Sequence, residues 1–150
     1  MKVRRAGPDD VEAIASLYLQ LKDHHRRLVP GSPRYEMDDD TWTAHARQGL
    51  EDPEKRFYVA QRGPEVIAFL KLFFEEKSWG RACEVETLVV DEHARERGVG
   101  HELMKTAEEV ARQEGALGMR VNVLQLNDEG RRFYERSGYR TIAIRYAKPL

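Results

Sequence analysis

The spacing of the apolar residues among the first fifty positions predicts one short strand and two helices. A short run over 2–6 predicts a strand that ends at Gly7-Pro8. Apolar residues spaced by three and four from Val11 to Leu21 predict an amphipathic helix. The polar stretch 23–37, which contains two prolines and a glycine, predicts a loop. A second helix is expected to begin at the aspartates 38–40 and to carry Trp42, Ala46 and Leu50.

The middle of the chain alternates between apolar runs and turn residues, which predicts an antiparallel meander. Strands are expected over 57–61 and 66–74, with a hairpin turn at 62–65 between them. A second polar loop is expected over 75–81. The run 84–90 is rich in β-branched and apolar residues, so it predicts a buried central strand.

The last third of the chain predicts a strand, helix, strand crossover followed by a helix and a final strand. The helix after Gly100 has one apolar face and a plausible C-terminal cap at Gly115. A strand over 118–124 follows, so it should lie parallel to 84–90. A short helix begins at Asn127 and closes at Gly138. The final strand, 139–146, alternates Ile142, Ile144 and Tyr146 with Thr141, Ala143 and Arg145.

Together these elements predict a single α/β domain over residues 1–150, with a mixed sheet of six or seven strands and about four helices. The chain of 150 residues has the usual length of one domain. Apolar residues make up 41% and charged residues 34%, as expected for a packed core with a charged surface.

Charge and cysteine content narrow the partners. A net charge of -1 disfavours nucleic acid as a partner. Cys83 is the one cysteine, so an internal disulfide is excluded and a reducing compartment fits. No apolar run has the length of a signal peptide or a membrane span, so we expect a cytoplasmic protein that does not enter a membrane. No His, Cys or Asp cluster has metal-ligand spacing, so no metal is expected.

The stretch 84–105 carries the strongest chemical signal, because a strand leads through a glycine turn into a helix. The first amides of a helix have no internal partner and the helix dipole adds positive charge there, so this geometry suits a phosphate. Glycine lets the backbone approach the anion. The turn, Arg95-Glu96-Arg97-Gly98-Val99-Gly100, is neither a dinucleotide fingerprint nor a Walker loop.

Two motifs resemble those of the GCN5-related N-acetyltransferase (GNAT) family. Residues 95–100, after the strand ending Leu88-Val89-Val90, are similar to the family's pyrophosphate loop. Residues 127–139 are similar to its second motif, N-x-x-A-x-x-F-Y-x-x-x-G-F. Gly130 stands for the usual alanine, Tyr139 for the usual phenylalanine, and Asp91 for the usual proline after the central strand.

The resemblance implies acetyl-CoA as the acyl donor and a primary amine, on a small molecule or a peptide, as the acceptor. It implies direct attack in a ternary complex and a central strand that splays from its parallel neighbour at a bulge. Leu88 and Val90 would pair with the pantetheine arm, and an amide near Leu88 or Val89 would stabilise the oxyanion. It also implies a homodimer as one arrangement. The pyrophosphate would be held by the loop residues Arg95, Glu96, Arg97, Gly98, Val99, Gly100 and His101.

The catalytic roles each have a structural alternative. Tyr134 occupies the family's general-acid position, but it could simply pack against the sheet. Glu84 and Glu86 share one strand face by alternation, so either could be the general base or bind a cationic acceptor, or both could make structural contacts. Asn127 is expected to cap its helix and also to contact the cofactor.

The remaining polar residues leave the acceptor open. Loops 23–37 and 75–81 are expected to shape the acceptor pocket, and His24 and His25 to lie on the surface. The aspartates 38–40 could attract a polyamine or a lysine, or serve only as a helix cap. The alternatives to an enzyme are a non-catalytic acyl-CoA sensor and a nucleotide-binding regulatory domain.

Overall fold

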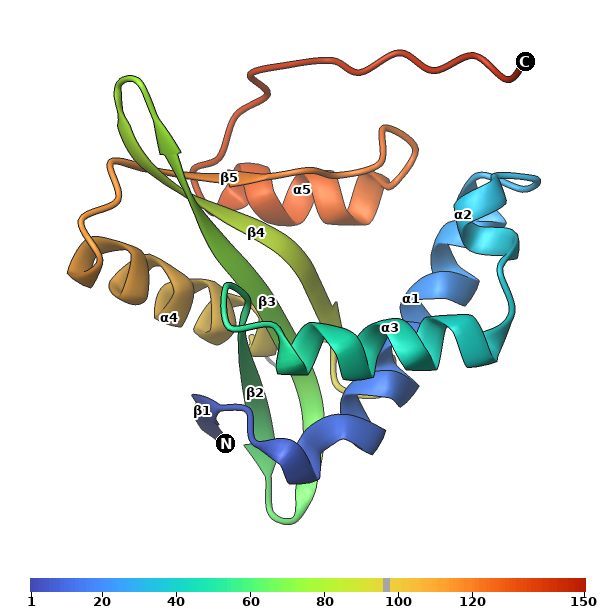
Figure 1. The fold of residues 1–150 in the computed structure, drawn as a ribbon, viewed down its shortest axis with the longest axis horizontal. Helices are drawn as coiled ribbons and strands as arrows, with labels where there is room; N and C mark the ends of the chain where they lie inside the picture. Colours follow the sequence, from blue (N-terminus) through green and yellow to red (C-terminus); the bar gives the residue numbers. More distant parts are fainter. Residues whose placement is uncertain (96–97) are drawn as a thin grey trace.

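The computed structural model describes residues 1–95 and 98–150 as one mixed sheet covered by helices on both faces (Figure 1). Strands β1 to β4 are antiparallel neighbours, and β5 joins β4 in parallel, which confirms the predicted crossover. None of the described helices is long and apolar enough to cross a membrane. The elements are β1 (Lys2–Arg5), the 3-10 helix η1 (Pro8–Asp10), α1 (Val11–Leu28), α2 (Pro33–Glu36), α3 (Asp39–Glu51), β2 (Arg56–Arg62), β3 (Glu65–Lys77), β4 (Gly80–Val90), α4 (Val99–Gln113), β5 (Gly118–Val121) and α5 (Asp128–Arg136).

Two apolar layers hold the sheet between its helices. Alternate residues of β3 point to opposite faces, so Phe69 packs under α1 and α3 while Leu70 packs under α4. The α1/α3 layer includes Ile14 and Trp42, and the α4 layer includes Leu103. The faces are therefore distinct, and each side chain of β4 can be assigned to one of them.

The predicted loop 23–37 is mostly helical. Helix α1 continues to Leu28, and α2 begins at Pro33, where the missing N–H of a proline costs no helical hydrogen bond. The expectation that His25 lies on the surface was wrong, since its ring is half-buried 5.2 Å from that of Tyr35. Burial lowers the pKa of His25 to about 4, so it packs as a neutral ring between α1 and α2.

The predicted loop 75–81 is a hairpin instead. Strand β3 runs to Lys77 and pairs with Gly80, which leaves only Ser78 and Trp79 in the turn. The charged residues that suggested a loop are paired along the strands, as in the 2.9 Å ion pair between Lys77 and Glu75. The prediction from hydrophobic alternation failed here because this end of the hairpin carries charged side chains, although its backbone keeps regular strand pairing.

The end of the chain departs furthest from the prediction. Strand β5 ends at Val121 rather than 124, and the segment 139–146 forms no strand. The described sheet therefore has five strands, not six or seven, and five α-helices rather than about four. A strand needs a neighbour for its backbone hydrogen bonds, and 139–146 has no strand partner among the described residues.

A buried carboxylate fixes the start of the chain to α1. Asp10, which is 6% exposed, accepts hydrogen bonds from both terminal nitrogens of Arg4 at 2.8 and 2.9 Å. It also accepts one from the Gly7 amide at 2.7 Å. The paired guanidinium of Arg4 is the main cause that lowers the pKa of Asp10. This cluster connects β1 to the first turn before α1.

We predict that Asp10→Asn lowers the free energy of unfolding by about 1.5–3 kcal/mol at pH 7, the range for a hydrogen bond to a charged group. Because the folded state lowers the pKa of Asp10, its contribution is complete above the ordinary value near ~3.9 and is lost as pH falls through the lower folded value. Urea unfolding from pH 7 down to the acid limit of folding measures both effects. Asp9→Asn, at an exposed neighbour, is the control and should change little; an equal loss there would contradict the assignment.

Candidate active site

The candidate site begins where the two parallel strands separate. Strands β4 and β5 pair only from Ala82↔Gly118 to Val85↔Val121. Strand β4 then continues to Val90 without β5 beside it. The backbone edge of 86–90 on that side therefore has no strand partner among the described residues, so its polar groups are free to bind something else. This confirms the predicted splay of the central strands.

A β-bulge lies at the point of separation. Lys71 pairs with Thr87 and Leu72 pairs with Val85, so Glu86 is an extra residue on β4. Leu72 and Val85 belong to the α4 layer, which places Lys71, Glu86 and Thr87 on the α1/α3 face. The bulge thus turns two consecutive polar side chains of β4 toward the same side.

Glu86 is held between two lysines. Its carboxylate contacts the amine of Lys71, whose side chain is 3% exposed, and that of Lys55 at 3.2 Å. Burial acts to raise the pKa of Glu86, but the two lysines outweigh it and the pKa falls below its usual range. The carboxylate therefore stays ionised, and the three groups together carry net positive charge.

Glu84 lies on the same face and is also paired. It sits opposite Phe73, which shares a face of β3 with Lys71. Its carboxylate lies 3.1 Å from Nε of Arg120 and accepts a 3.1 Å hydrogen bond from Asn122. Both glutamates therefore make structural ion pairs, and a catalytic role for either remains a prediction.

The predicted phosphate loop ends at a glycine-capped helix. Gly98 precedes α4 with φ 70°, a left-handed conformation that favours glycine. The first bond into α4 runs from the Glu102 amide to Gly98, so the amides of 99–101 lie in the unpaired first turn. Arg95 Nε donates to the Val90 carbonyl at 3.3 Å. Glu96 and Arg97, also expected in this loop, lie outside the described residues.

Gly100 and α5 are in close contact. A Cβ on Gly100 would lie 3.1 Å from two ring carbons of Phe133, so a larger residue there would push α5 away. The His101 ring is 5.2 Å from that of Phe133, and its Nδ1 is 3.4 Å from Ser137 Oγ. The two motifs of the sequence analysis are thus brought together by packing.

Tyr134 packs on the α4 side of the sheet. Its ring meets those of Phe133 and Tyr139 edge to face, at 5.0 and 5.7 Å between centroids. It contacts the same layer as Leu88 and Val90. Burial raises the pKa of Tyr134, so the phenol keeps its proton at neutral pH. Tyr134 and the two glutamates lie on opposite faces of the sheet.

Asn127 caps α5, as predicted. Its side chain accepts a 3.0 Å hydrogen bond from the Gly130 amide. A Cβ at Gly130 would lie 2.6 Å from Asn127 Nδ2. The cap therefore favours glycine at position 130, where a side chain would press on Asn127. Contact of Asn127 with a cofactor remains a prediction.

The contacts of several residues that shape the site were not predicted from the sequence. Asp91 accepts from Gln20 at 2.9 Å and from the His93 amide at 2.9 Å, so α1 fixes the turn where the family pattern has proline. Lys71 could have been found, since it is a lone charged residue in an apolar strand. Tyr18 is 2% exposed, and its hydroxyl has no hydrogen-bond partner among the described residues.

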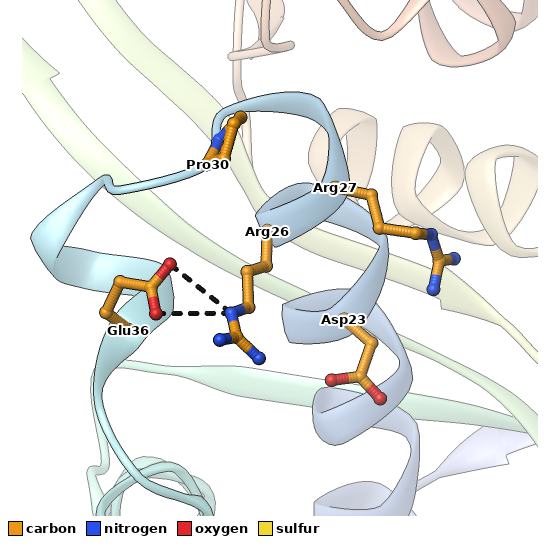
Figure 2. Close-up of a pocket in the computed structure, with 5 residues that line it drawn as sticks. All are labelled: Asp23, Arg26, Arg27, Pro30 and Glu36. Atoms are coloured by element: carbon orange, nitrogen blue, oxygen red, sulfur yellow. Dashed lines mark hydrogen bonds and ion pairs between the residues drawn. The ribbon is translucent and has the colours of Figure 1, made fainter.

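A hollow of about 330 Å³ lies between the end of α1 and α2 (Figure 2). The ion pair of Arg26 with Glu36, at 3.2 Å, crosses it. A second hollow, of about 240 Å³, lies beside the first turns of α4. The first hollow falls in the segment 23–37 that was expected to shape the acceptor pocket.

A crossover whose parallel strands separate beside a glycine-capped helix, with a tyrosine-bearing second helix packed on that cap, is the arrangement expected for the acyltransferase family that the sequence motifs resemble. The chain belongs to the acetyltransferase (GNAT) family, whose model matches residues 16–139. The chain is accordingly an enzyme of the N-acetyltransferase type.

Relatives agree over nearly the whole chain. The uncharacterized N-acetyltransferase YhfO of Bacillus subtilis is 30% identical over 141 residues, covering 93% of this chain and 89% of that protein. The aminoalkylphosphonate N-acetyltransferase of Salmonella typhimurium is 26% identical, covering 99% and 91%. A crystallised mutant of the BH1408 protein from Bacillus halodurans has the same fold, with a TM-score of 0.82, 19% identity, and coverage of 100% and 99%.

We predict that Gly98→Val weakens binding of coenzyme A, because a β-branched residue resists positive φ at the start of α4. Among the described residues other than its chain neighbour, no heavy atom lies within 4 Å of a Cβ built at Gly98, so the expected effect comes from conformation. Gly98→Asn is the matched control, since asparagine tolerates this region and should retain most of the affinity. Calorimetric titration measures both; wild-type affinity in the valine variant would contradict the placement of the anion site.

Proposed function

We propose that the chain transfers an acetyl group from acetyl-CoA to a primary amine by direct attack in a ternary complex. The observation that carries this is the separation of β4 from β5 at the Glu86 bulge, beside the first turn of α4. The separation leaves a backbone edge for an amide-bearing chain, and the helix start suits its pyrophosphate.

The residues present fit such a donor. Backbone groups of Leu88 and Val90, on the part of β4 that β5 does not pair, would bind the pantetheine arm like an added strand, and an amide of Leu88 or Val89 would donate to the oxyanion. The amides of 99–101, with Arg95, would bind the pyrophosphate. The Val90 carbonyl accepts from Arg95 at 3.3 Å, so donor binding at that carbonyl would require Arg95 to move.

The proton transfers are assigned to opposite faces of the sheet. Tyr134 keeps its proton and would donate to the departing thiolate. The proton of the amine would leave through water held by Glu84 or Glu86. Both carboxylates are already ion-paired, so relay through water fits better than direct abstraction.

The charges near Glu86 favour an acceptor that carries an anion as well as its amine. Lys71 and Lys55 both contact the carboxylate of Glu86, so this cluster carries one more positive charge than negative charge. The acidic run 38–40 is partly occupied: Asp38 caps α3 and Asp39 pairs with Lys22 at 2.9 Å. An aminoalkylphosphonate, the substrate in the name of the Salmonella relative, has this chemistry.

Release of thiol from acetyl-CoA, measured against a panel of amines beside a titration of the cofactor alone, tests the function. Turnover with any amine class supports it. Tight binding without turnover would favour the alternative, a non-catalytic acyl-CoA sensor, although the relatives compared above are named as enzymes.

We predict that Tyr134→Phe lowers kcat by roughly 10- to 1000-fold with little change in cofactor affinity, because it removes the acid and retains the ring packing. Steady-state kinetics and a cofactor titration separate the two. Tyr139→Phe is the matched control, since it removes a hydroxyl that donates to Glu108 at 3.1 Å and not the acid. Unchanged kcat in Tyr134→Phe would remove the acid role.

We predict that Lys55→Gln, which removes the more exposed of the two lysines that contact Glu86, raises KM for an aminoalkylphosphonate by roughly 10- to 100-fold, the equivalent of one hydrogen bond to a charged group. KM for an uncharged primary amine of similar length should change little. Arg47→Gln removes the same charge from α3, where Arg47 pairs with Glu12, and is the control. If a polyamine is the better substrate, the anionic-acceptor proposal is wrong while the acetyltransferase proposal stands.

A further inference from the structure

The first four backbone amides after β4 all have hydrogen-bond partners. The Asp91 amide donates to a carbonyl of β3 at 2.8 Å, which continues the pairing of the two strands. The His93 amide donates to the Asp91 carboxylate and the Ala94 amide to the Asp91 carbonyl, both at 2.9 Å. The Glu92 amide donates out of the turn, to Gln20 Oε1 on α1 at 3.2 Å. These amides are occupied, which leaves the pyrophosphate of a donor to amides later in the loop.

Gln20 holds this turn with both ends of its side-chain amide. Its Nε2 donates to Asp91 Oδ2 at 2.9 Å while its Oε1 accepts from the Glu92 amide. The hydrogen bond from Gln20 is the main cause that lowers the pKa of Asp91, so the carboxylate is ionised where it accepts from Gln20 and His93. Figure 1 shows the connection that follows β4 lying beside α1, although Gln20 and Asp91 are 71 positions apart in the sequence.

This turn is also where the chain departs from the family pattern, which has proline in place of Asp91. Proline would fix φ at this position, and it would remove the amide that Asp91 donates to β3. The chain retains that amide and restrains the turn through side chains instead. Gln20 supplies this restraint from another element, since it bonds both to the carboxylate of Asp91 and to the backbone of the next residue.

We propose that Gln20 is a positioning residue for the donor, because it holds the turn at Asp91 in the conformation from which the following loop binds the pyrophosphate of acetyl-CoA. This inference rests on the proposed function, which supplies acetyl-CoA as the donor. Gln20 does not touch the donor and acts through the turn. A turn that is already ordered loses less conformational entropy when the anion binds to the amides of 99–101.

A purely structural role for Gln20 predicts a different result. Gln20 lies two residues after Tyr18, which is 2% exposed and packs on Phe69. If Gln20 only attached α1 to the sheet, its loss would disturb the whole α1/α3 face, including the side proposed for the acceptor. If it positions the turn, its loss affects the part of the donor that carries the pyrophosphate and leaves KM for the amine unchanged.

Gln20→Leu, which removes both hydrogen bonds and retains a side chain of similar size, is expected to raise the Kd of CoA roughly 10-fold, the equivalent of about one hydrogen bond. Calorimetric titration measures this Kd. The kcat at saturating acetyl-CoA and KM for the amine should stay close to wild type, as should turnover with acetylpantetheine, a donor without pyrophosphate. Gln48→Leu changes an exposed glutamine of α3 and is the control. Equal losses with the two donors would overturn the positioning role.

An exchange of the two side chains tests the hydrogen bonds themselves. Gln20→Glu alone sets two carboxylates against each other, and Asp91→Asn alone sets one N–H group against another however the two amides are turned. The double variant restores every bond and retains the net charge: its new carboxylate accepts from the new amide and from the Glu92 amide, and the new amide oxygen accepts from His93. Each single variant should weaken CoA binding roughly 10-fold, and the double variant should recover to within about threefold of wild type.

Binding of CoA to the wild-type chain separates this inference from the proposed function. A double variant as weak as the single variants, or Gln20→Leu with wild-type affinity for CoA, would overturn the role of Gln20 and leave the acetyltransferase proposal standing. A wild-type chain that neither binds CoA nor releases it from acetyl-CoA would overturn both. The exchange also decides the question if Gln20→Leu does not fold, because the double variant retains the hydrogen bonds between α1 and the turn.

Discussion

The ion pair of Lys71 with Glu86 is the interaction on which the arrangement of the sheet depends. A lysine amine that is almost fully buried must have a counter-charge, and the bulge on β4 supplies it by adding one residue opposite Lys71. The same added residue marks where β4 leaves β5. One buried charge therefore ties the register of the meander to the opening of the parallel pair. Apolar residues in place of the pair can preserve stability, but they would remove the buried charge that Glu86 neutralises at the bulge.

A second set of contacts places the anion end relative to that opening. Gln20 of α1 bonds the turn at Asp91, and Phe133 of α5 rests on Gly100 in the first turn of α4. The loop between β4 and α4 is thus held from both faces of the sheet. The groups proposed for proton transfer follow the same division, with Tyr134 on the α4 face of the sheet and the two glutamates on the α1/α3 face. Strand β4 therefore lies between the two sets of groups.

How far the sequence predicts this structure depends on whether a signal is local. The crossover from β4 through α4 to β5, the Gly98 turn and the Asn127 cap were all predicted, because glycine conformation and helix capping are decided by neighbouring residues. The hairpin at 75–81 was missed because its strands carry charges, and residues 23–28 because polar residues can occupy a helix whose packing face is narrow. The ion pairs of Glu84 and Glu86 were beyond prediction, since their partners Arg120 and Lys71 come from other strands. Alternation placed both glutamates on one face without saying what met them there.

The segment 139–146 shows the difference between the tendency to form a strand and the existence of one. Its alternation indicates that one face would be apolar and the other polar, as in any half-buried strand. It does not report which sheet supplies the hydrogen bonds. Among the described residues no strand pairs with 139–146, and the chain is exposed from Arg140 onward. The prediction of a strand at 139–146 was therefore wrong for this structure, although the alternation that suggested it is present in the sequence.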